Sequence, residues 1–413
     1  MSTPTPTPPP AAAAPGAAPA KKMKRVKVTR VVNGVDTEVE IEVEDTGEGP
    51  TWGPKKDHKL INTRMTRVDG PLKVTGAAKY THDMRLPGML YGRILRSPHS
   101  RARVKSLDLA PALALSGVKV AVKAPGDDLY FEGQAVAAVA AETPDRADDA
   151  LRAIKVEYEV LPHVLDPEAA GKPDVPTIML NEPNVEPKEK KGDPAKVEAA
   201  WASCDVVVEG DYKTPFIHHC SLETHGHVID FRGGDSATVY TSTQGIFSVK
   251  ADAVKALGLP DANVSVICEN MGGGFGSKFG IGVEGALAIE MSKKVGAPVH
   301  LMLTRRDEFS LSGNRSSSWQ TLKGGATKDG RFVALNAYQR RLGGIADGSQ
   351  PAQPYVYNVE NAYAEVVSVH TNETPSRAMR APGHPQASFG IEMVVDELAY
   401  KIGMDPVESA RRT

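Results

Sequence analysis

Hydrophobic and polar positions follow two periodicities in the first half of the chain: one predicts strands and the other predicts helices. The segments 89–100, 117–125 and 155–162 alternate or nearly alternate and predict strands, while the almost wholly apolar run 132–142 predicts a buried strand. Between them, residues 144–155 repeat with helical spacing, and Thr143 followed by Pro144 is typical of a helix start.

The second half mixes the same two periodicities. Residues 251–258 and 283–296 have helical periodicity and end at glycine, whereas 265–270 and 298–303 read as strands. A long amphipathic helix is expected before Gly403, with an apolar face that includes Phe389, Met393, Leu398 and Ile402. This mixture predicts an α+β fold.

Changes in composition divide the chain. Residues 1–22 are mostly Pro, Ala and Thr and are expected to be disordered. Asn33-Gly34 between two alternating runs predicts a β-hairpin over 23–45. We interpret 46–70 as a linker, 71–165 as a first α/β domain, 166–193 as a second, Pro- and Lys-rich linker, and 194–413 as a second domain.

Composition and charge narrow the class of protein. The 413 residues are 41% hydrophobic with a net charge of −2, so nothing calls for a nucleic-acid partner. No apolar run approaches the roughly 18 residues that a membrane span needs, so no membrane insertion is expected. Cys204, Cys220 and Cys268 lack the spacing of a zinc or iron–sulfur site and are expected to be free thiols, which fits a cytoplasmic protein. The alternative is a periplasmic location, reached by export of the folded chain together with a partner that carries a signal.

One segment, NMGGGFGSKFG at 270–280, carries five glycines between a predicted strand and a predicted helix. Such a run admits positive φ angles and lets main-chain N–H groups approach an acceptor, as an anion cradle requires. The spacing fits neither a dinucleotide fingerprint nor a P-loop, since Lys278 is followed by Phe279. A glycine-rich turn imposed by tight packing remains the alternative.

A second segment places arginines at the entrance of the long C-terminal helix. Arg377, Arg380, Pro382 and Gly383 lie just before it. Fixed turns that carry arginines at a helix entrance suit an oxyanion or a phosphate. Taken alone, each arginine could equally form an ordinary surface ion pair.

Together these segments resemble the molybdenum hydroxylases, the family of xanthine dehydrogenase and aldehyde oxidase. Residues 241–278, TSTQGIFSVKADAVKALGLPDANVSVICENMGGGFGSK, resemble the T-Q, L-G-[LV]-P and M-G-G-G-F-G-G-K motifs of its large subunit. Residues 376–408 resemble its A-x-R-x-x-G-x-P-Q segment and the following helix, 71–165 its hammerhead domain, and HHCSLETHGHVIDF at 218–231 its H-x-x-[ML]-E-x-H segment. The resemblance extends over about 60–413 in the family's order.

The resemblance implies a molybdenum–pyranopterin cofactor, held without a direct protein ligand to the metal. By matching motifs, Gly273, Gly274, Phe275 and Gly276 would contact it through the main chain. Gln244 would donate its amide to an oxo ligand, and Arg380 would lie next to the metal. The implied fold is a hammerhead domain followed by the first half of a molybdopterin-binding domain. The family reaction is hydroxylation with water as the oxygen source, and electrons leave through iron–sulfur clusters.

Two departures bear on the substrate. Xanthine-type members have glutamate where this chain has Phe279, and phenylalanine where it has Pro382. Both residues would line the substrate pocket. The resemblance therefore implies a small non-purine substrate, such as an aldehyde or an N-heterocycle.

A third departure is a missing motif. The family's large subunit continues beyond the segments matched here and contains a G-x-G-E glutamate that acts as general base, and no counterpart occurs in this sequence. We therefore expect a separate chain to supply a C-terminal molybdopterin-binding half, a [2Fe-2S] subunit to accept electrons, and an FAD subunit to be a further candidate partner. The pterin could carry a cytosine dinucleotide. The alternative is a non-catalytic relic or assembly subunit that keeps the fold without metal.

Overall fold

The computed structural model describes residues 23–32, 35–44, 58–61, 63–178, 182–349, 351 and 353–412. The predicted tail 1–22, the turn Asn33-Gly34 and most of the predicted linker 46–70 lie outside these residues. The chain divides into two compact units, Met1–Pro71 and Leu72–Thr413, which we describe separately.

The first unit contains the predicted hairpin. Strand β1 (Met23–Val32) pairs antiparallel with β2 (Val35–Glu44), with Met23 opposite Glu44 and Val32 opposite Val35. This register leaves two residues for the turn, as the Asn-Gly pair predicts. The exposed side chains of Arg25 and Glu42 form an ion pair across the two strands, at 3.3 Å between Nε and Oε1.

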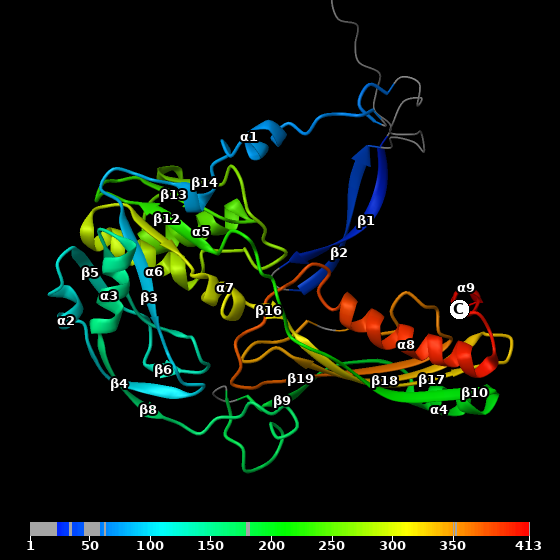
Figure 1. The fold of residues 1–413 in the computed structure, drawn as a ribbon. Helices are drawn as coiled ribbons and strands as arrows, with labels where there is room; N and C mark the ends of the chain where they lie inside the picture. The colour runs from blue at the N-terminus through cyan, green and yellow to red at the C-terminus, as the bar shows by residue number, and fades with distance from the viewer. Residues whose placement is uncertain are drawn as a thin grey trace, which may run out of the picture. The chain divides into compact units, whose positions relative to one another are not determined.

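A seven-stranded mixed sheet forms one half of the second unit (Figure 1). Its strand order is β14-β13-β12-β15-β3-β7-β5. The strands are β3 (Leu90–Arg96), β5 (Val118–Lys123), β7 (Ala135–Ala141), β12 (Gly226–Asp230), β13 (Ala237–Thr241), β14 (Val264–Ile267) and β15 (Val299–Met302). Each predicted strand in these regions is present, with ends within a few residues of those expected.

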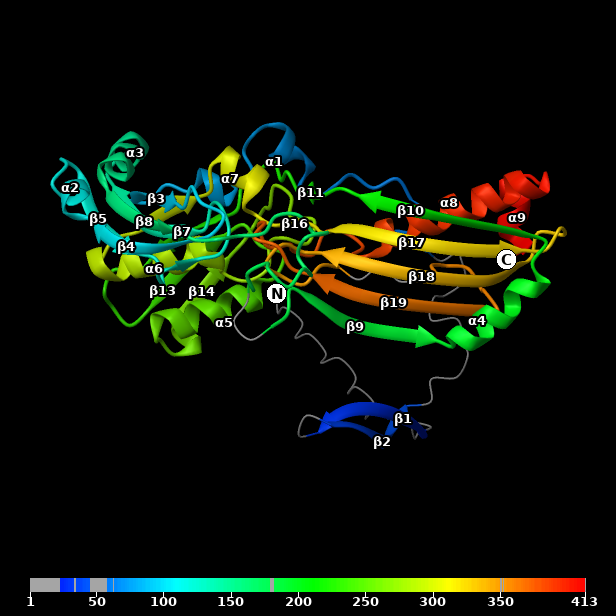
Figure 2. The same ribbon diagram turned by 90° about the horizontal axis from the view of Figure 1, so that it is seen from below.

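Strand β7 is buried on both sides because helices cover both faces of this sheet. Ala138 and Ala140 pack in the core that contains α6 (Gly282–Val295), whereas the alternate residues Val139 and Ala141 pack against α3 (Pro144–Ala153). Figure 2 shows α3 on one side and α6 on the other, together with α5 (Ile246–Leu257). The Thr143 side chain accepts from the Arg146 N–H and caps α3 as predicted.

A five-stranded sheet with the order β10-β17-β18-β19-β9 forms the other half of this unit (Figure 2). Its strands are β9 (Val185–Gly192), β10 (Val206–Thr214), β17 (Ser317–Ala326), β18 (Phe332–Leu342) and β19 (Asn361–Val369). Helix α8 (His384–Ile402) packs on β10 and β17, and α4 (Pro194–Ala200) lies on the opposite face against β18 and β19 (Figure 1).

Shorter elements complete the second unit, and α1 spans the boundary between the two units in the sequence. A three-stranded sheet has the order β6-β4-β8, and β11 pairs with β16. These elements and the remaining helices are α1 (Gly70–Val74), β4 (Ala102–Asp108), α2 (Ala110–Leu113), β6 (Asp128–Leu129), β8 (Lys155–Val160), β11 (Ile217–His218), α7 (Arg305–Ser310), β16 (Asn314–Arg315) and α9 (Pro406–Arg412). The α+β class predicted from the sequence is thus confirmed.

The structure departs from the sequence-based picture in three places. The segment 166–193, expected to be a linker, contains the edge strand β9 and contributes Ala170 and Ile178 to a core cluster. The predicted domains 71–165 and 194–413 share the seven-stranded sheet, since β3 pairs in parallel with β15. Each half therefore completes the hydrogen bonding of the other.

The third departure is the buried face of α8. The helix ends at Gly403 as predicted, but Phe389 and Met393 are 43% and 40% exposed. Leu398 is buried as predicted, but its neighbours in the buried stripe are Ile391 and Val394, together with small residues that let the helix approach the sheet closely. No helix within the described residues combines the length and apolar character needed to cross a membrane.

Candidate functional site

The glycine-rich segment forms the turn between β14 and α6. Gly273, Phe275 and Gly276 have φ angles of +101°, +54° and +111°, a conformation that residues with a Cβ rarely adopt. Within the described part of the chain, the main-chain N–H groups of Gly273, Gly274 and Phe275 donate no hydrogen bond. Three successive donors are therefore available to an acceptor outside the chain. We call residues 272–278 the glycine loop.

Close contacts explain why two positions of the glycine loop lack a side chain. A Cβ on Gly274 would lie 2.4 Å from Oε1 of Gln244, and a Cβ on Gly276 would lie 2.5 Å from the carbonyl oxygen of Ala378. Both distances are shorter than real Cβ contacts allow. Packing alone thus requires glycine at 276, where the contact is with main chain, whereas a Cβ at 274 would displace the Gln244 side chain. Packing does not explain the unpaired N–H groups.

Gln244, which follows β13, holds the glycine loop from one side by two hydrogen bonds. Its Oε1 accepts from the Gly276 N–H at 2.7 Å, and its own N–H donates to the carbonyl of Lys278 at 2.8 Å. Because Oε1 faces an N–H donor, the amide nitrogen Nε2 must be the other end of the group. The residue is exposed, so Nε2 can donate to a group that lies against the loop.

The residues before α8 fasten the loop from the other side, and we call residues 376–383 the arginine loop. The Arg380 N–H donates to the Phe275 carbonyl at 2.7 Å, and Arg377 Nη1 donates to the Ser277 carbonyl at 3.2 Å. Buried Arg315 in turn donates from Nη2 to the Arg380 carbonyl at 2.7 Å. The main chain of Arg380 is thereby held while its side chain stays exposed.

The two residues assigned to a substrate pocket are also exposed. Phe279, just after the glycine loop, is 55% exposed, and its ring lies beside Gly245. Pro382 is exposed in the arginine loop. Six of the eight residues singled out from the sequence thus lie on the two loops, which contact one another directly, and Gln244 and Phe279 lie beside them.

His219 connects the arginine loop to β16. Its Nε2 lies 2.8 Å from the Ala378 carbonyl and its Nδ1 lies 3.3 Å from the Gly313 carbonyl. Burial lowers the pKa of this histidine, although the two carbonyls oppose the effect. The nitrogen nearer its carbonyl, Nε2, is therefore the better donor for the neutral ring.

A buried charged network beneath the loop joins two motif positions, Lys278 and Glu223, to which the sequence assigned no role. The Lys278 side chain is fully buried and that of Glu223 is 5% exposed, with Nζ and Oε2 4.0 Å apart. From local sequence, a lysine in a glycine-rich turn is expected to be exposed to solvent. Its burial depends on residues 223 and 242, which are distant in sequence.

A second buried pair lies close by. His225 donates from its main-chain N–H at 2.9 Å to Oε2 of Glu308, and its Nδ1 lies 2.8 Å from the same oxygen. Burial by itself would raise the pKa of Glu308, but the hydrogen bonds and charge of His225 outweigh it and hold that pKa below its usual value. The pair fixes α7 to the start of β12 and does not touch the glycine loop.

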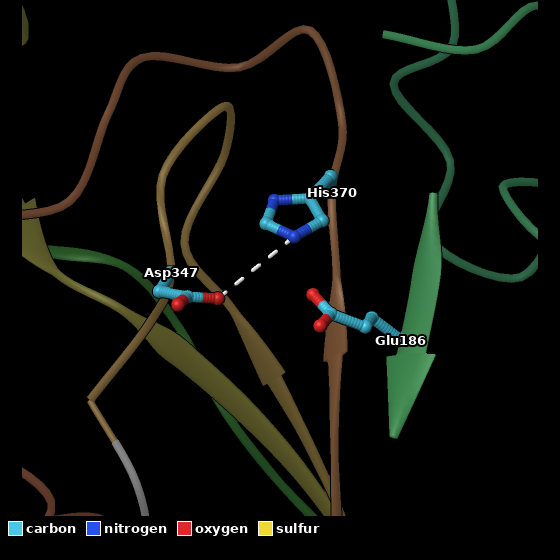
Figure 3. Close-up of side chains that lie close together, drawn as sticks. All are labelled: Glu186, Asp347 and His370. Atoms are coloured by element: carbon cyan, nitrogen blue, oxygen red, sulfur yellow. Dashed lines mark ion pairs between the residues drawn. The ribbon is translucent and has the colours of Figure 1, made fainter. Parts of the chain in front are cut away.

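Glu186, Asp347 and His370 form a separate cluster with metal-ligating side chains (Figure 3). Their candidate ligand atoms all lie within 4.8 Å of one another, and His370 Nε2 is 3.8 Å from Asp347 Oδ1. Such a group of residue types could hold a divalent cation.

Two positive side chains already neutralise the carboxylates of this cluster. Arg341 Nη2 lies 3.1 Å and Lys188 Nζ lies 3.5 Å from Oδ1 of Asp347, and Lys188 also pairs with Glu186. A metal ion would have to displace or repel both cations. We therefore interpret the cluster as ion pairs that join β9 to β18 and β19, and assign no metal to it.

A cavity of about 940 Å³ lies elsewhere in the second unit. Its lining includes Arg96, Glu132, Arg306, Asp307 and Glu373. Neither the glycine loop nor Arg380 contributes to it. The two loops instead form an exposed surface that offers main-chain N–H groups, an amide and a guanidinium, a set suited to an anionic, oxygen-rich ligand.

Family models match most of the second unit. Residues 179–413 match the molybdopterin cofactor-binding domain, and residues 75–126 match the a/b hammerhead domain of aldehyde oxidase and xanthine dehydrogenase. The match to the cofactor-binding domain includes both loops and Gln244.

Curated relatives and solved structures agree. The nicotinate dehydrogenase large molybdopterin subunit of Eubacterium barkeri is 32% identical over 382 residues, covering 86% of this chain and 89% of that protein. The molybdenum-binding subunit of the aldehyde oxidoreductase of Escherichia coli (strain K12) is 28% identical over 372 residues, covering 85% of this chain and 50% of the relative. A solved CO dehydrogenase from Oligotropha carboxidovorans has the same fold, with a TM-score of 0.76 at 24% identity over 84% of this chain and 49% of its own.

Proposed function

Because the chain belongs to the molybdopterin-binding large-subunit family of the aldehyde oxidases and xanthine dehydrogenases, we propose that it carries the first half of the cofactor site of a molybdenum hydroxylase. The observation that carries this proposal is the glycine loop. It presents three unpaired N–H groups beside the Gln244 amide and the exposed Arg380 side chain. The family models and the relatives confirm the family resemblance inferred from the motifs, and the site assignment remains our proposal.

The residues fit a molybdenum–pyranopterin in chemical terms. Its oxo and phosphate oxygens are acceptors with negative charge, and the loops offer donors and one guanidinium. The main chain of Gly273 to Phe275 would hold the ligand by N–H groups, Gln244 Nε2 would donate to an oxygen, and Arg380 would supply positive charge. When bound, the cofactor supplies the redox chemistry that oxidises a substrate C–H bond with oxygen from water.

We propose a small non-purine substrate, an aldehyde or an N-heterocycle. Phe279 and Pro382 replace the glutamate and phenylalanine that xanthine-type members place at these positions. Neither residue can accept or donate a side-chain hydrogen bond, so the polar edge of a purine would find no partner here. Their role in this chain is to pack against an apolar part of the substrate and to exclude water.

A second chain is proposed to complete the site. Apolar side chains beside the loops are exposed, including Leu222 (87%), Phe247 (86%) and Phe275 (46%), as is typical of a surface that another chain covers. The chain spans about half the length of two of the matched proteins and 89% of the nicotinate dehydrogenase subunit. A separate molybdopterin-binding half with a G-x-G-E glutamate is therefore proposed, with [2Fe-2S] and FAD subunits as electron-transfer partners.

The compartment and the form of the cofactor belong to the same proposal. A cytoplasmic location fits the free cysteines, since all three are unpaired in the structure. The cofactor is proposed as the pyranopterin, either alone or as its cytosine dinucleotide. Neither choice alters the donors that the two loops present.

Purification from the native host tests the proposal. The full chain is isolated with whatever copurifies, and metal and pterin contents are measured by mass spectrometry. Molybdenum at about one per chain, together with a second chain that contains G-x-G-E, is expected. A metal-free chain without such a companion would overturn the proposal and favour the non-catalytic relic or assembly subunit.

Two variants connect the metal to the loops. Arg380→Ala and Gln244→Ala are each expected to lower the molybdenum retained by about tenfold, because each removes one donor or charge to the ligand. Arg331→Ala, an exposed arginine in the β17–β18 turn, is the matched control and should retain it. Equal retention in all three variants would place the cofactor elsewhere.

A further inference from the structure

Glu223, just ahead of β12, makes four hydrogen bonds around the first residue of the glycine loop. Its Oε2 accepts from the Gly272 N–H and from Ser242 Oγ, both at 2.8 Å. Its own N–H donates to the Gly272 carbonyl at 3.1 Å, and its Oε1 accepts from the His82 N–H at 3.3 Å. Residue 223 therefore holds both polar groups of the Gly272 main chain.

Lys278, the last residue of the loop, returns to the same place. Its Nζ donates at 2.7 Å to the Glu223 carbonyl and at 2.7 Å to Ser242 Oγ. Burial lowers the pKa of Lys278, and the charge of Glu223 opposes that effect most strongly. The lysine carbonyl in turn accepts from the Gln244 N–H and from Thr243 Oγ1.

The loop is thus clamped at both ends. Five residues, 273–277, lie between the two fastened positions, and they include all three unpaired N–H groups. The approach is close, because a Cβ on Gly272 would lie 2.4 Å from Cβ of Glu223. No other described residue accepts a hydrogen bond from the N–H of Gly272.

We propose that Glu223 is the positioning residue of the glycine loop, acting through Lys278 and Ser242 to fix the directions of the loop N–H groups. This inference rests on the proposed function for the identity of the ligand, but the clamp itself belongs to the chain alone. A buried lysine without its carboxylate is unstable in place. Loss of the Glu223 charge would therefore draw Lys278 toward water and pull the end of the loop with it.

Hydrogen exchange on the full chain tests the clamp without any cofactor. In Glu223→Gln, peptides from 271–279 should exchange about tenfold faster than in the wild type, whereas peptides from β15 should not change. Glu373→Gln is the control, since Glu373 is also partly buried but accepts from Thr371 Oγ1 and contacts neither Lys278 nor the glycine loop. It should leave exchange over 271–279 unaltered. Unchanged loop exchange in Glu223→Gln would overturn the proposal.

A double variant that removes both buried charges distinguishes loss of the clamp from simple misfolding. Lys278→Met leaves Glu223 buried without its partner, whereas Glu223→Gln with Lys278→Met removes both charges. The double variant should protect the loop better than either single variant, as coupled charges require. A double variant no better than Lys278→Met would contradict the clamp, and this comparison holds even where Glu223→Gln does not fold.

Molybdenum content, measured in parallel, separates the two proposals. Faster loop exchange together with at least about tenfold less metal in Glu223→Gln supports the positioning role in full. Unchanged metal alongside faster loop exchange would show that the clamp does not serve the cofactor and would overturn that role. A wild-type chain without molybdenum would overturn the proposed function, while the exchange measurements would still decide whether Glu223 shapes the loop.

Discussion

His300 on β15 is a buried histidine whose protonation the fold opposes. Burial lowers its pKa from 6.5 to about 4, and the carbonyl of His82, 3.3 Å from Nε2, offsets only part of this effect. Between pH 6.5 and 4, His300 is therefore largely protonated in the unfolded chain and largely neutral in the folded chain. The stabilising difference is fully present above pH 6.5 and is lost as the pH falls through that window.

Between pH 7.5 and pH 5 the full chain should therefore lose about 2 kcal/mol of stability from this residue. Chemical denaturation at pH 7.5 and at pH 5 measures the effect. His300→Phe should reduce the dependence on pH, whereas His163→Phe, at an exposed position, should leave it as in the wild type. An equal dependence in the wild type and in His300→Phe would show that other groups carry it.

Gly276 combines a left-handed backbone with a close contact. Gly276→Ala should reduce retained molybdenum at least about tenfold, because a Cβ would meet the Ala378 carbonyl and force the two loops apart. Gly258→Ala is the control, since its φ is +71° but nothing lies within 4 Å of the added Cβ. It should cost about 1 kcal/mol of stability and leave the metal in place. Similar metal contents in both variants would contradict the proposal that the glycine loop holds the cofactor.

The sequence anticipated residues that act through local conformation. Gly274, Gly276 and Arg380 belong to short motifs whose backbone requirements can be read in place. Glu223 and Lys278 also occupy motif positions, but their burial and their contact could not be predicted in the same way. Their roles depend on a contact across 55 positions, and local sequence does not reveal whether a lysine is solvated or buried.

At the scale of elements, α8 shows how periodicity can identify a helix and still misplace its face. Phe389 and Met393 suggested the apolar stripe, yet the sheet packs against a neighbouring stripe that contains Ile391. Gly390 explains the choice, because Leu322 approaches the helix there to within 2.9 Å of where a Cβ would lie. Small residues select the face that can approach a sheet most closely.

The corrected face predicts unequal costs for two truncations on α8. Ile391→Ala should lower the free energy of unfolding by about 2 to 5 kcal/mol, because it leaves a cavity against the five-stranded sheet. Met393→Ala removes a 40% exposed side chain and should cost less than about 1 kcal/mol. Urea denaturation of both variants provides the comparison. A larger loss from Met393→Ala would restore the face inferred from the sequence.

Strand β9 shows a limit of a different kind. Its sequence, VEPKEKKG, is dominated by glutamate and lysine and contains a proline, so composition favoured a linker. The strand pairs with β19 and occupies the edge of the sheet, where a proline and lysines are tolerated. Edge position is a property of topology, and a local pattern does not encode it.

At the scale of the whole molecule, the division into Met1–Pro71 and Leu72–Thr413 predicts thermodynamic independence. Removal of residues 1–57 should leave the thermal midpoint of the second unit unchanged, because both core sheets lie beyond that segment. Differential scanning calorimetry of the shortened and full chains checks this. A lower midpoint in the shortened chain would reveal stabilising contacts between the two units.

The pairing of β3 with β15 has a consequence for biosynthesis. About 200 residues separate the two strands, so one edge of β3 leaves the ribosome long before its partner exists. At roughly 5 to 20 residues per second, that edge waits about 10 to 40 s on the nascent chain. Translation speed and chaperone access over this interval should therefore govern how much of the protein reaches its native state.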